Sequence, residues 1–218
     1  MINNQTVKPL RHYQSVYQDL DPKEIARRCN LEFDSITSSF SLRVLGTEYH
    51  VPHPVFALLD SKKLDSEIIE VTNAYEKILF IHYLCEGKYF PPQGRRLSYN
   101  EIPWGSVYYR NFEGRVLKRC ALALGRDIPS LAKMIEQNPG LRAAPQDLGD
   151  GSWRIEFING LYITLILWQA DDEFPPSAQI LFDDNFVFAF TAEDLAVAGE
   201  IITERLKKML ICKQSKGE

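Results

Sequence analysis

One stretch in the last third of the chain limits the possible folds more than any other. Residues 153–158 and 161–168 are rich in β-branched and aromatic residues, and only Asn159-Gly160 separates them. An Asn-Gly pair readily adopts the positive φ angles of a two-residue hairpin turn, so the pattern predicts two antiparallel strands. The second run is apolar on both faces, so we expect it in the centre of a sheet and covered on both sides.

Strands elsewhere in the chain are also expected in hairpins. A third strand over 178–182 follows the predicted pair, and the connection to it is too short for a comfortable parallel crossover. It should therefore run antiparallel to its neighbour. Near the N-terminus, alternating apolar residues predict another hairpin, with a turn at Gly46-Thr47 that would set Val44 against Tyr49.

Amphipathic helices are predicted in separate blocks. Apolar residues recur at helical spacing after Asp21, over about 66–86, over about 106–124, over 128–137, and after Thr191. The core face of the last helix is expected to be Leu195, Ala198, Ile202, Leu206 and Met209.

This arrangement lacks the β-α-β alternation of a parallel sheet, so it predicts an α+β fold. We expect an antiparallel sheet packed against several amphipathic helices, including a long C-terminal helix. The chain should form a single domain over 1–218, with an ordered core over about 10–212 and a flexible tail after it.

Charge and apolar patterning exclude some partners. The net charge is −4, and the short basic pairs lie among acids, so we expect no nucleic-acid partner. The longest apolar run, 161–168, has eight residues and is too short to cross a membrane. The chain begins without the apolar segment of a secretory signal, and its four cysteines are scattered. These features predict a cytoplasmic protein with reduced thiols.

Several motifs, taken in order, resemble one known family. They are Tyr17-Gln18-Asp19-Leu20-Asp21-Pro22-Lys23-Glu24-Ile25-Ala26-Arg27-Arg28, then Trp168 with Asp172-Glu173-Phe174-Pro175, then Leu181-Phe182-Asp183, then Thr191-Ala192-Glu193-Asp194-Leu195. They resemble the bacterial and archaeal domain of unknown function thirty-seven eighty-six, which is found mostly in anaerobes. The resemblance covers nearly the whole chain.

The resemblance implies little chemistry. Some members of that family are joined to a four-cysteine iron–sulfur domain, which points to redox or one-carbon metabolism. This chain lacks that cysteine cluster, so we expect no iron–sulfur cluster on it.

Acidic residues recur in the family-like motifs: Asp172, Glu173, Asp183, Glu193 and Asp194. Clustered carboxylates can hold a hard cation or act as a general acid/base pair. However, antiparallel neighbouring strands would place Asp172 and Asp183 near opposite ends of the sheet, roughly 20 Å apart. We therefore interpret these acids mainly as turn-forming and capping residues, and we predict no metal site.

The histidines give a weak signal for catalysis or metal binding. His82 falls on the apolar stripe of its predicted helix, which is typical of a hydrogen-bonded core residue more than of a ligand. His50 and His53 lie close together but have no third ligand suggested by spacing. No nucleophile motif or glycine-rich phosphate loop accompanies them.

A long loop rich in glycine, proline and aromatic residues precedes the helix that starts at about 106. Its candidate ligand-binding residues are Arg95, Arg96, Ser98, Trp104 and Ser106. Paired guanidinium groups next to a helix N-terminus suit an anion. Two interpretations stay open: the loop binds a ligand, or its arginines pair with surface acids such as Glu101 while Trp104 seals the core.

The leading hypothesis is an accessory or ligand-binding domain that binds an anionic small molecule or a protein partner in anaerobic metabolism. The alternative is a metal-assisted enzyme that uses Asp172, Glu173 and Asp183, with His82 as a possible further member of the site. A third hypothesis is a scaffold that assembles through an exposed face.

Overall fold

The structure is a computed structural model that describes residues 4–60, 71 and 73–214. Within these residues the strands form one antiparallel sheet of nine strands, in the order β4-β3-β2-β7-β8-β9-β5, with β1 beside β2 and β6 beside β7. The strands are β1 (Glu32–Asp34), β2 (Ser39–Val44), β3 (Thr47–Pro52), β4 (Leu59–Asp60), β5 (Arg96–Ser98), β6 (Ala144–Pro145), β7 (Gly151–Ile158), β8 (Leu161–Trp168) and β9 (Ser177–Asp183).

The helices pack against this sheet in two groups. They are α1 (Asn4–Asp19), α2 (Pro22–Cys29), α3 (Ala74–Glu86), α4 (Gly105–Phe112), α5 (Lys118–Leu124), α6 (Ile128–Glu136), α7 (Phe186–Ala189) and α8 (Ala192–Gln214). The described residues also form short turns of 3₁₀-helix, η2 (Tyr99–Glu101) and η4 (Pro139–Leu141), and a π-helical turn, η3 (Glu113–Leu117). The α+β prediction is confirmed.

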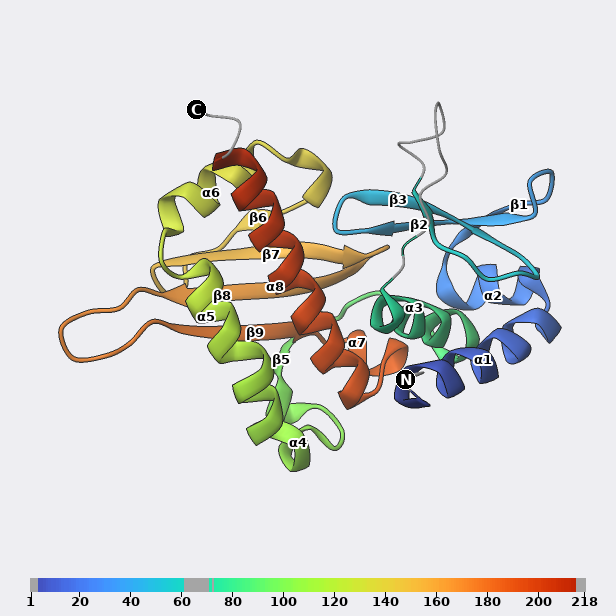
Figure 1. Cartoon of the computed structure of the whole chain (residues 1–218), viewed down its shortest axis with the longest axis horizontal. Coiled ribbons are helices and arrows are strands. Elements are labelled where there is room, and N and C mark those ends of the chain that lie inside the picture. The colour runs from blue at the N-terminus through green and yellow to red at the C-terminus, as the bar shows by residue number, and fades with distance from the viewer. Residues whose placement is uncertain (1–3, 61–70, 72, 215–218) are drawn as a thin grey trace.

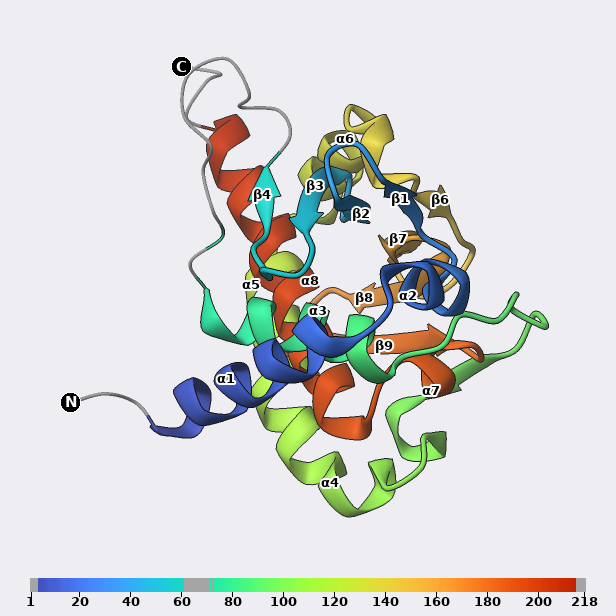
Figure 2. The ribbon, with the colours of Figure 1, turned by 90° about the vertical axis from the view of Figure 1, so that its right-hand side faces the viewer.

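Figure 1 shows how the helices cover the sheet. The long α8 crosses one face of β7, β8 and β9, with α4 and α5 beside it, while α1, α2 and α3 lie toward the β1–β3 end. Turned by 90°, the molecule shows α1 and α3 side by side, and these two helices contact each other (Figure 2). None of the helices that the structure describes combines the length and apolarity needed to cross a membrane.

The hydrophobic core lies between this covered face of the sheet and the helices. Phe157 and Phe182 on the strands, and Leu195 and Leu206 on α8, belong to one cluster of fully buried side chains. Met209 packs against the cluster and is only partly buried. The predicted core face of the last helix is therefore confirmed, since apolar residues at helical spacing bury themselves together.

One turn prediction and one helix-cap prediction, the two with the strongest local signals, are confirmed. Asn159-Gly160 connects β7 to β8, with φ +78° at Gly160. At the start of α8, Thr191 and Asp194 exchange hydrogen bonds: each side chain accepts from the other residue's backbone N–H, at 3.3 Å and 3.0 Å. This reciprocal capping satisfies N–H groups that the first helical turn leaves free.

The predicted register of the first hairpin is wrong. The turn is Leu45-Gly46, not Gly46-Thr47, so Val44 pairs with Thr47 and Tyr49 pairs with Leu42. Leu45 and Gly46 both have positive φ, as a type I′ turn requires. Leucine is an unusual choice there, but its side chain is buried, and this burial offsets the cost of the left-handed backbone.

Two helices differ from the expectation. The sequence pattern did not predict α1, which contains Pro9 and carries few apolar residues. Helix α3 begins at Ala74, where the Asn73 side chain accepts hydrogen bonds from two backbone N–H groups. Residues 66–70 and 72 of the helix predicted there lie outside the described residues.

Candidate functional site

The long helix made by α4, η3 and α5 carries an exposed apolar surface at its start. Trp104 is 74% exposed, Val107 68% and Tyr108 50%. Val107 and Tyr108 lie in the first turn of α4, and Trp104 directly precedes that turn. We call this surface the α4 face. Large apolar side chains that remain in water contribute little to folding, so such a surface indicates a binding role.

Trp104 is the least expected residue of the α4 face. Its backbone is left-handed, with φ 66° and ψ −3°. The following residue, Gly105, fixes this bend because a Cβ there would lie 1.7 Å from the carbonyl oxygen of Tyr99. A non-glycine residue in this conformation costs about 1–2 kcal/mol. Glycine would adopt the bend freely, and the exposed indole gains little packing energy in return. The fold therefore does not explain why this residue is tryptophan.

A groove of about 620 Å³ runs along the same helix, between it and the loop that connects β8 to β9. We call it the α5 groove. Its walls are mainly apolar and comprise Tyr109, Leu117, Ala121, Leu122, Phe174, Pro175, Pro176 and Ala178, with Glu113, Lys118 and Ser177 as polar members. Leu122 and Phe174 are themselves more than half exposed. Mostly apolar grooves with a few polar groups are typical of ligand and peptide sites.

The π-helical turn η3 lies in the middle of this helix, and such turns occur frequently at functional sites. It directs Arg115 toward α8, where the guanidinium donates to both oxygens of Glu200 at 2.8 and 3.1 Å and to Glu193 at 2.9 Å. The hydrogen bond and attraction of these two carboxylates raise the pKa of Arg115 above its ordinary value. On α8, Gly199 leaves space for Val116 of the π turn.

The helix is basic although the chain is acidic. Residues 105–124 contain four cations against one acid (Arg110, Arg115, Lys118 and Arg119 against Glu113), which gives a formal charge of +3, whereas the whole chain carries −4. Arg115 is neutralised by α8, but Arg110, Lys118 and Arg119 are exposed. The helix therefore carries net positive charge, although Lys118 lies 3.9 Å from Glu113 and Arg119 lines a separate pocket beside α8.

The five loop residues predicted to bind a ligand fall into two groups. Arg96 and Ser98 lie on β5, where the Arg96 guanidinium donates to Gln146 at 2.6 Å and the Ser98 hydroxyl donates to Glu101 at 2.8 Å. Arg95 is held through its backbone N–H by Asp184. Trp104 and Ser106 lie at the start of α4, on the exposed surface. In the described part of the chain, no hydrogen bond or ion pair joins the two groups.

The acidic residues of the family-like motifs are also dispersed. Asp172 and Glu173 lie in the exposed β8–β9 loop, whereas Asp183 is buried at the other end of β9 and pairs with Arg154. The antiparallel pairing of β8 with β9 confirms the predicted layout. Glu193 contacts Arg115, and Asp194 contacts His82 instead. No three His, Cys, Asp or Glu side chains among the described residues are grouped so that they could hold a metal ion.

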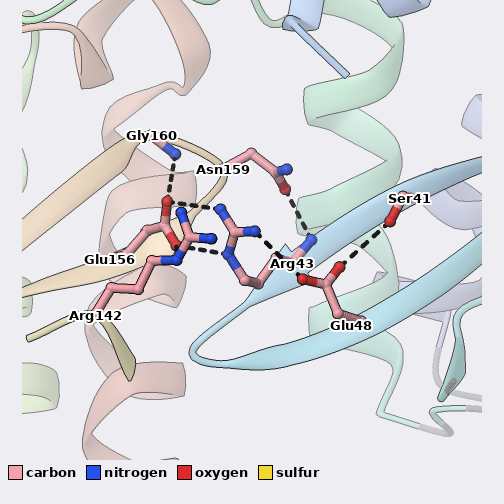
Figure 3. Close-up of polar contacts among 7 residues, drawn as sticks. All are labelled: Ser41, Arg43, Glu48, Arg142, Glu156, Asn159 and Gly160. Carbon is pink, nitrogen blue, oxygen red and sulfur yellow. Dashed lines mark hydrogen bonds and ion pairs between the residues drawn. The ribbon is translucent and has the colours of Figure 1, made fainter. Parts of the chain in front are cut away.

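A buried charged cluster lies on the face of the sheet opposite α8, and the sequence analysis did not identify it (Figure 3). Glu156 of β7 is 3% exposed, and its carboxylate accepts two hydrogen bonds from Arg43 of β2, at 2.7 and 3.0 Å. The Gly160 N–H donates to it at 2.9 Å, and Arg142 lies 3.6 Å away. Burial raises the pKa of Glu156, but the Arg43 and Gly160 hydrogen bonds outweigh this and lower it.

This cluster, the Glu156 clasp, joins β2 to β7 where the two strands share little backbone pairing. Val44 and Ile158 are the one register pair between them. Arg43 also receives its own backbone contact, because the Asn159 side chain accepts from the Arg43 N–H at 2.8 Å. All its charges are matched within the protein, so we interpret the clasp as structural. The sequence does contain a signal for the clasp. Arg43 in β2 and Glu156 in β7 are charged residues that alternate with the apolar core residues of their strands.

His82 is hydrogen-bonded, as predicted. Its Nδ1 lies 3.0 Å from one carboxylate oxygen of Asp194, and the two residues join α3 to the start of α8.

Comparisons with known proteins identify a family but no activity. A family model described as "Domain of unknown function (DUF3786)" matches residues 21–205. No curated protein and no solved structure matches the chain.

Proposed function

The chain belongs to the DUF3786 family, whose description names no activity, and we propose that it is an accessory domain that binds a protein partner through the α4 face and the α5 groove. The observation that carries this proposal is Trp104, a left-handed and 74% exposed tryptophan that the fold does not need. Exposed aromatic side chains that enter a partner's pocket often supply most of the binding energy of an interface.

The chemistry of the surface defines the partner. The apolar residues of the α4 face and the α5 groove would accept apolar side chains, and Arg110, Lys118 and Arg119 would attract acidic ones. The partner we propose is therefore an acidic protein segment with apolar residues on one face. The exposed side chains of Val107 and Tyr108 in the first turn of α4, next to Trp104, suit a partner helix that lies along α4.

The setting we propose is the anaerobic metabolism expected from the family resemblance. Arg95 and Arg96, the residue before β5 and its first residue, are also exposed and would add long-range attraction without belonging to the α4 face. In this proposal they attract the acidic partner and do not form a separate anion pocket. The carboxylates Asp172, Glu173 and Asp183 have no catalytic role in it, because they lie at two ends of the sheet.

Replacement of Trp104 by glycine tests the proposal. Trp104→Gly relieves the left-handed strain, so the free energy of unfolding should change by less than about 1 kcal/mol. Binding should weaken at least tenfold, the typical cost of about 1.4 kcal/mol or more for losing an interface anchor. Ile36→Ala is the matched control, because Ile36 is 93% exposed and lies far along the chain, between β1 and β2.

The probe for this test is a synthetic acidic helical peptide with leucine and phenylalanine on one face, followed by isothermal titration calorimetry. A second peptide with lysine in place of every glutamate tests the role of charge. The proposal predicts binding of the acidic peptide by the wild type and by Ile36→Ala, and weaker binding by Trp104→Gly. Equal affinities for all three proteins, or no binding of the acidic peptide, would contradict it.

A further inference from the structure

A small pocket outside the α4 face and the α5 groove contains a histidine that is hydrogen-bonded to a carboxylate, His82 with Asp194. Its volume is about 160 Å³, and it lies between the end of α3 and the connection from α7 to α8. It is lined by His82, Glu86, Val187, Phe188, Ala189, Phe190, Thr191 and Asp194. The capping of α8 and the packing of α3 explain the positions of only some of these side chains.

His82 is oriented by a chain of hydrogen bonds. Its Nδ1 donates to Asp194, whose other carboxylate oxygen accepts from the Thr191 hydroxyl at 2.7 Å and from the Thr191 N–H at 3.0 Å. The ring of Tyr13 packs edge-on against the imidazole, with 4.0 Å between the ring centroids. Because Nδ1 carries the proton that Asp194 accepts, the neutral ring keeps its free lone pair on Nε2.

The charged side chains that line the pocket are acidic. Glu86 and Asp194 are carboxylates, and neither lysine nor arginine is among the lining residues. The groups that face His82 are Tyr13 of α1 (itself in contact with His12 and near Cys85), Glu86 of α3, and Asp194 of α8. The Tyr13 hydroxyl donates to Glu86 at 3.0 Å, and burial together with that bond raises the pKa of Tyr13 to about 12.

The protonation of His82 follows from these neighbours. Burial lowers the pKa of His82, but the hydrogen bond and the charge of Asp194, with a contribution from Glu86, outweigh it, so the pKa is raised above its ordinary value. An anion would be repelled by the two carboxylates. A small cation that donates hydrogen bonds would be attracted by them, and the exposed ring of Phe188 would add a favourable contact.

We propose that this pocket binds a small primary ammonium or amine group, which donates N–H bonds to Nε2 of His82 and to the carboxylate of Glu86. The volume limits the bound part to a few non-hydrogen atoms, since a water molecule occupies about 30 Å³ of liquid. A purely structural role would need only the Nδ1 bond to Asp194. It would not use the free Nε2, whereas Glu86 already accepts a hydrogen bond from the Tyr13 hydroxyl through Oε1. This site is independent of the α4 face.

Nuclear magnetic resonance titration tests the proposal with methylammonium chloride as the probe. The Cε1–H signal of His82 should shift and saturate with millimolar methylammonium, while tetramethylammonium chloride, which has the same charge and no N–H, should leave it unchanged. Because a proton on His82 competes with the cation, the affinity for methylammonium should rise as the pH increases through the pKa of His82.

Variants separate binding from folding. Glu86 is exposed, so Glu86→Gln should fold like the wild type and bind methylammonium at least fivefold more weakly. His50→Gln, a change at an exposed histidine of β3, is the matched control and should bind like the wild type. A non-saturating shift, an equal response to tetramethylammonium, or unchanged binding by Glu86→Gln would each overturn the proposal.

Discussion

Substitutions in the Glu156 clasp can be ranked by the loss of stability that each should cause. Arg43→Met keeps the apolar stem of the side chain and removes the guanidinium that donates twice to Glu156. The carboxylate of Glu156 would stay buried with only the Gly160 N–H and the more distant Arg142 as partners. Breaking a buried ion pair from one side costs about 3–5 kcal/mol, because the remaining charge lacks both water and its partner. Since Arg142 compensates in part, we expect about 3 kcal/mol here.

The reverse change should cost less. Glu156→Gln leaves Arg43 as the unpaired group, but the Arg43 side chain is 19% exposed and also lies 3.3 Å from Glu48. Its charge therefore keeps some water and one acidic partner. We expect a loss of about 1–3 kcal/mol, the usual cost of a lost hydrogen bond to a charged group. The double variant should be less destabilised than the sum of the two single changes, because it leaves no buried unpaired charge.

Urea denaturation followed by circular dichroism measures these free energies, and pH supplies an internal check. The pKa of Glu156 is lowered in the folded protein, so its contribution is present above the ordinary glutamate pKa and is lost as the pH falls through the folded value. The difference between wild type and Arg43→Met should therefore shrink as the pH is lowered from 7 toward 3. A larger cost for Glu156→Gln, or a difference that does not change with pH, would refute the reasoning.

Two further predictions concern glycine positions. Gly199→Ala would place a Cβ 2.6 Å from Val116 of the π turn, so it should destabilise the protein by about 1–3 kcal/mol, and adding Val116→Ala should recover part of this loss in thermal melts. Gly160→Ala combines φ +78° with a contact of 2.9 Å to the Tyr89 ring and should cost at least about 1–2 kcal/mol. In the same urea assay Gly114→Ala, where a Cβ meets open space, should be neutral or stabilising.

The proposed binding surface and the Glu156 clasp lie on different sides of the sheet. The clasp stabilises the join between β2 and β7, while the α4 face and the α5 groove lie along a helix on the covered side (Figure 1). Variants of the clasp should therefore alter stability without altering the interaction surface directly. This separation lets the binding experiments and the stability experiments be interpreted independently.

The sequence alone predicted those features that neighbouring residues decide. Asn159-Gly160 specifies the β7–β8 turn because its backbone preferences need no distant contact. The reciprocal cap between Thr191 and Asp194 likewise depends on residues three positions apart. The alternation of apolar residues in the strands and their helical spacing elsewhere were sufficient to predict the α+β class.

Only the tertiary structure decided which distant residues meet and which remain in water. Arg43 and Glu156 are 113 positions apart, and their contact depends on β2 lying beside β7 in the correct register. The sequence left open whether Trp104 seals the core, and the close packing of Gly105 on Tyr99 turns its side chain outward instead. Local preferences act through the adjacent backbone, whereas ion pairing and exposure depend on the order in which the strands and helices pack.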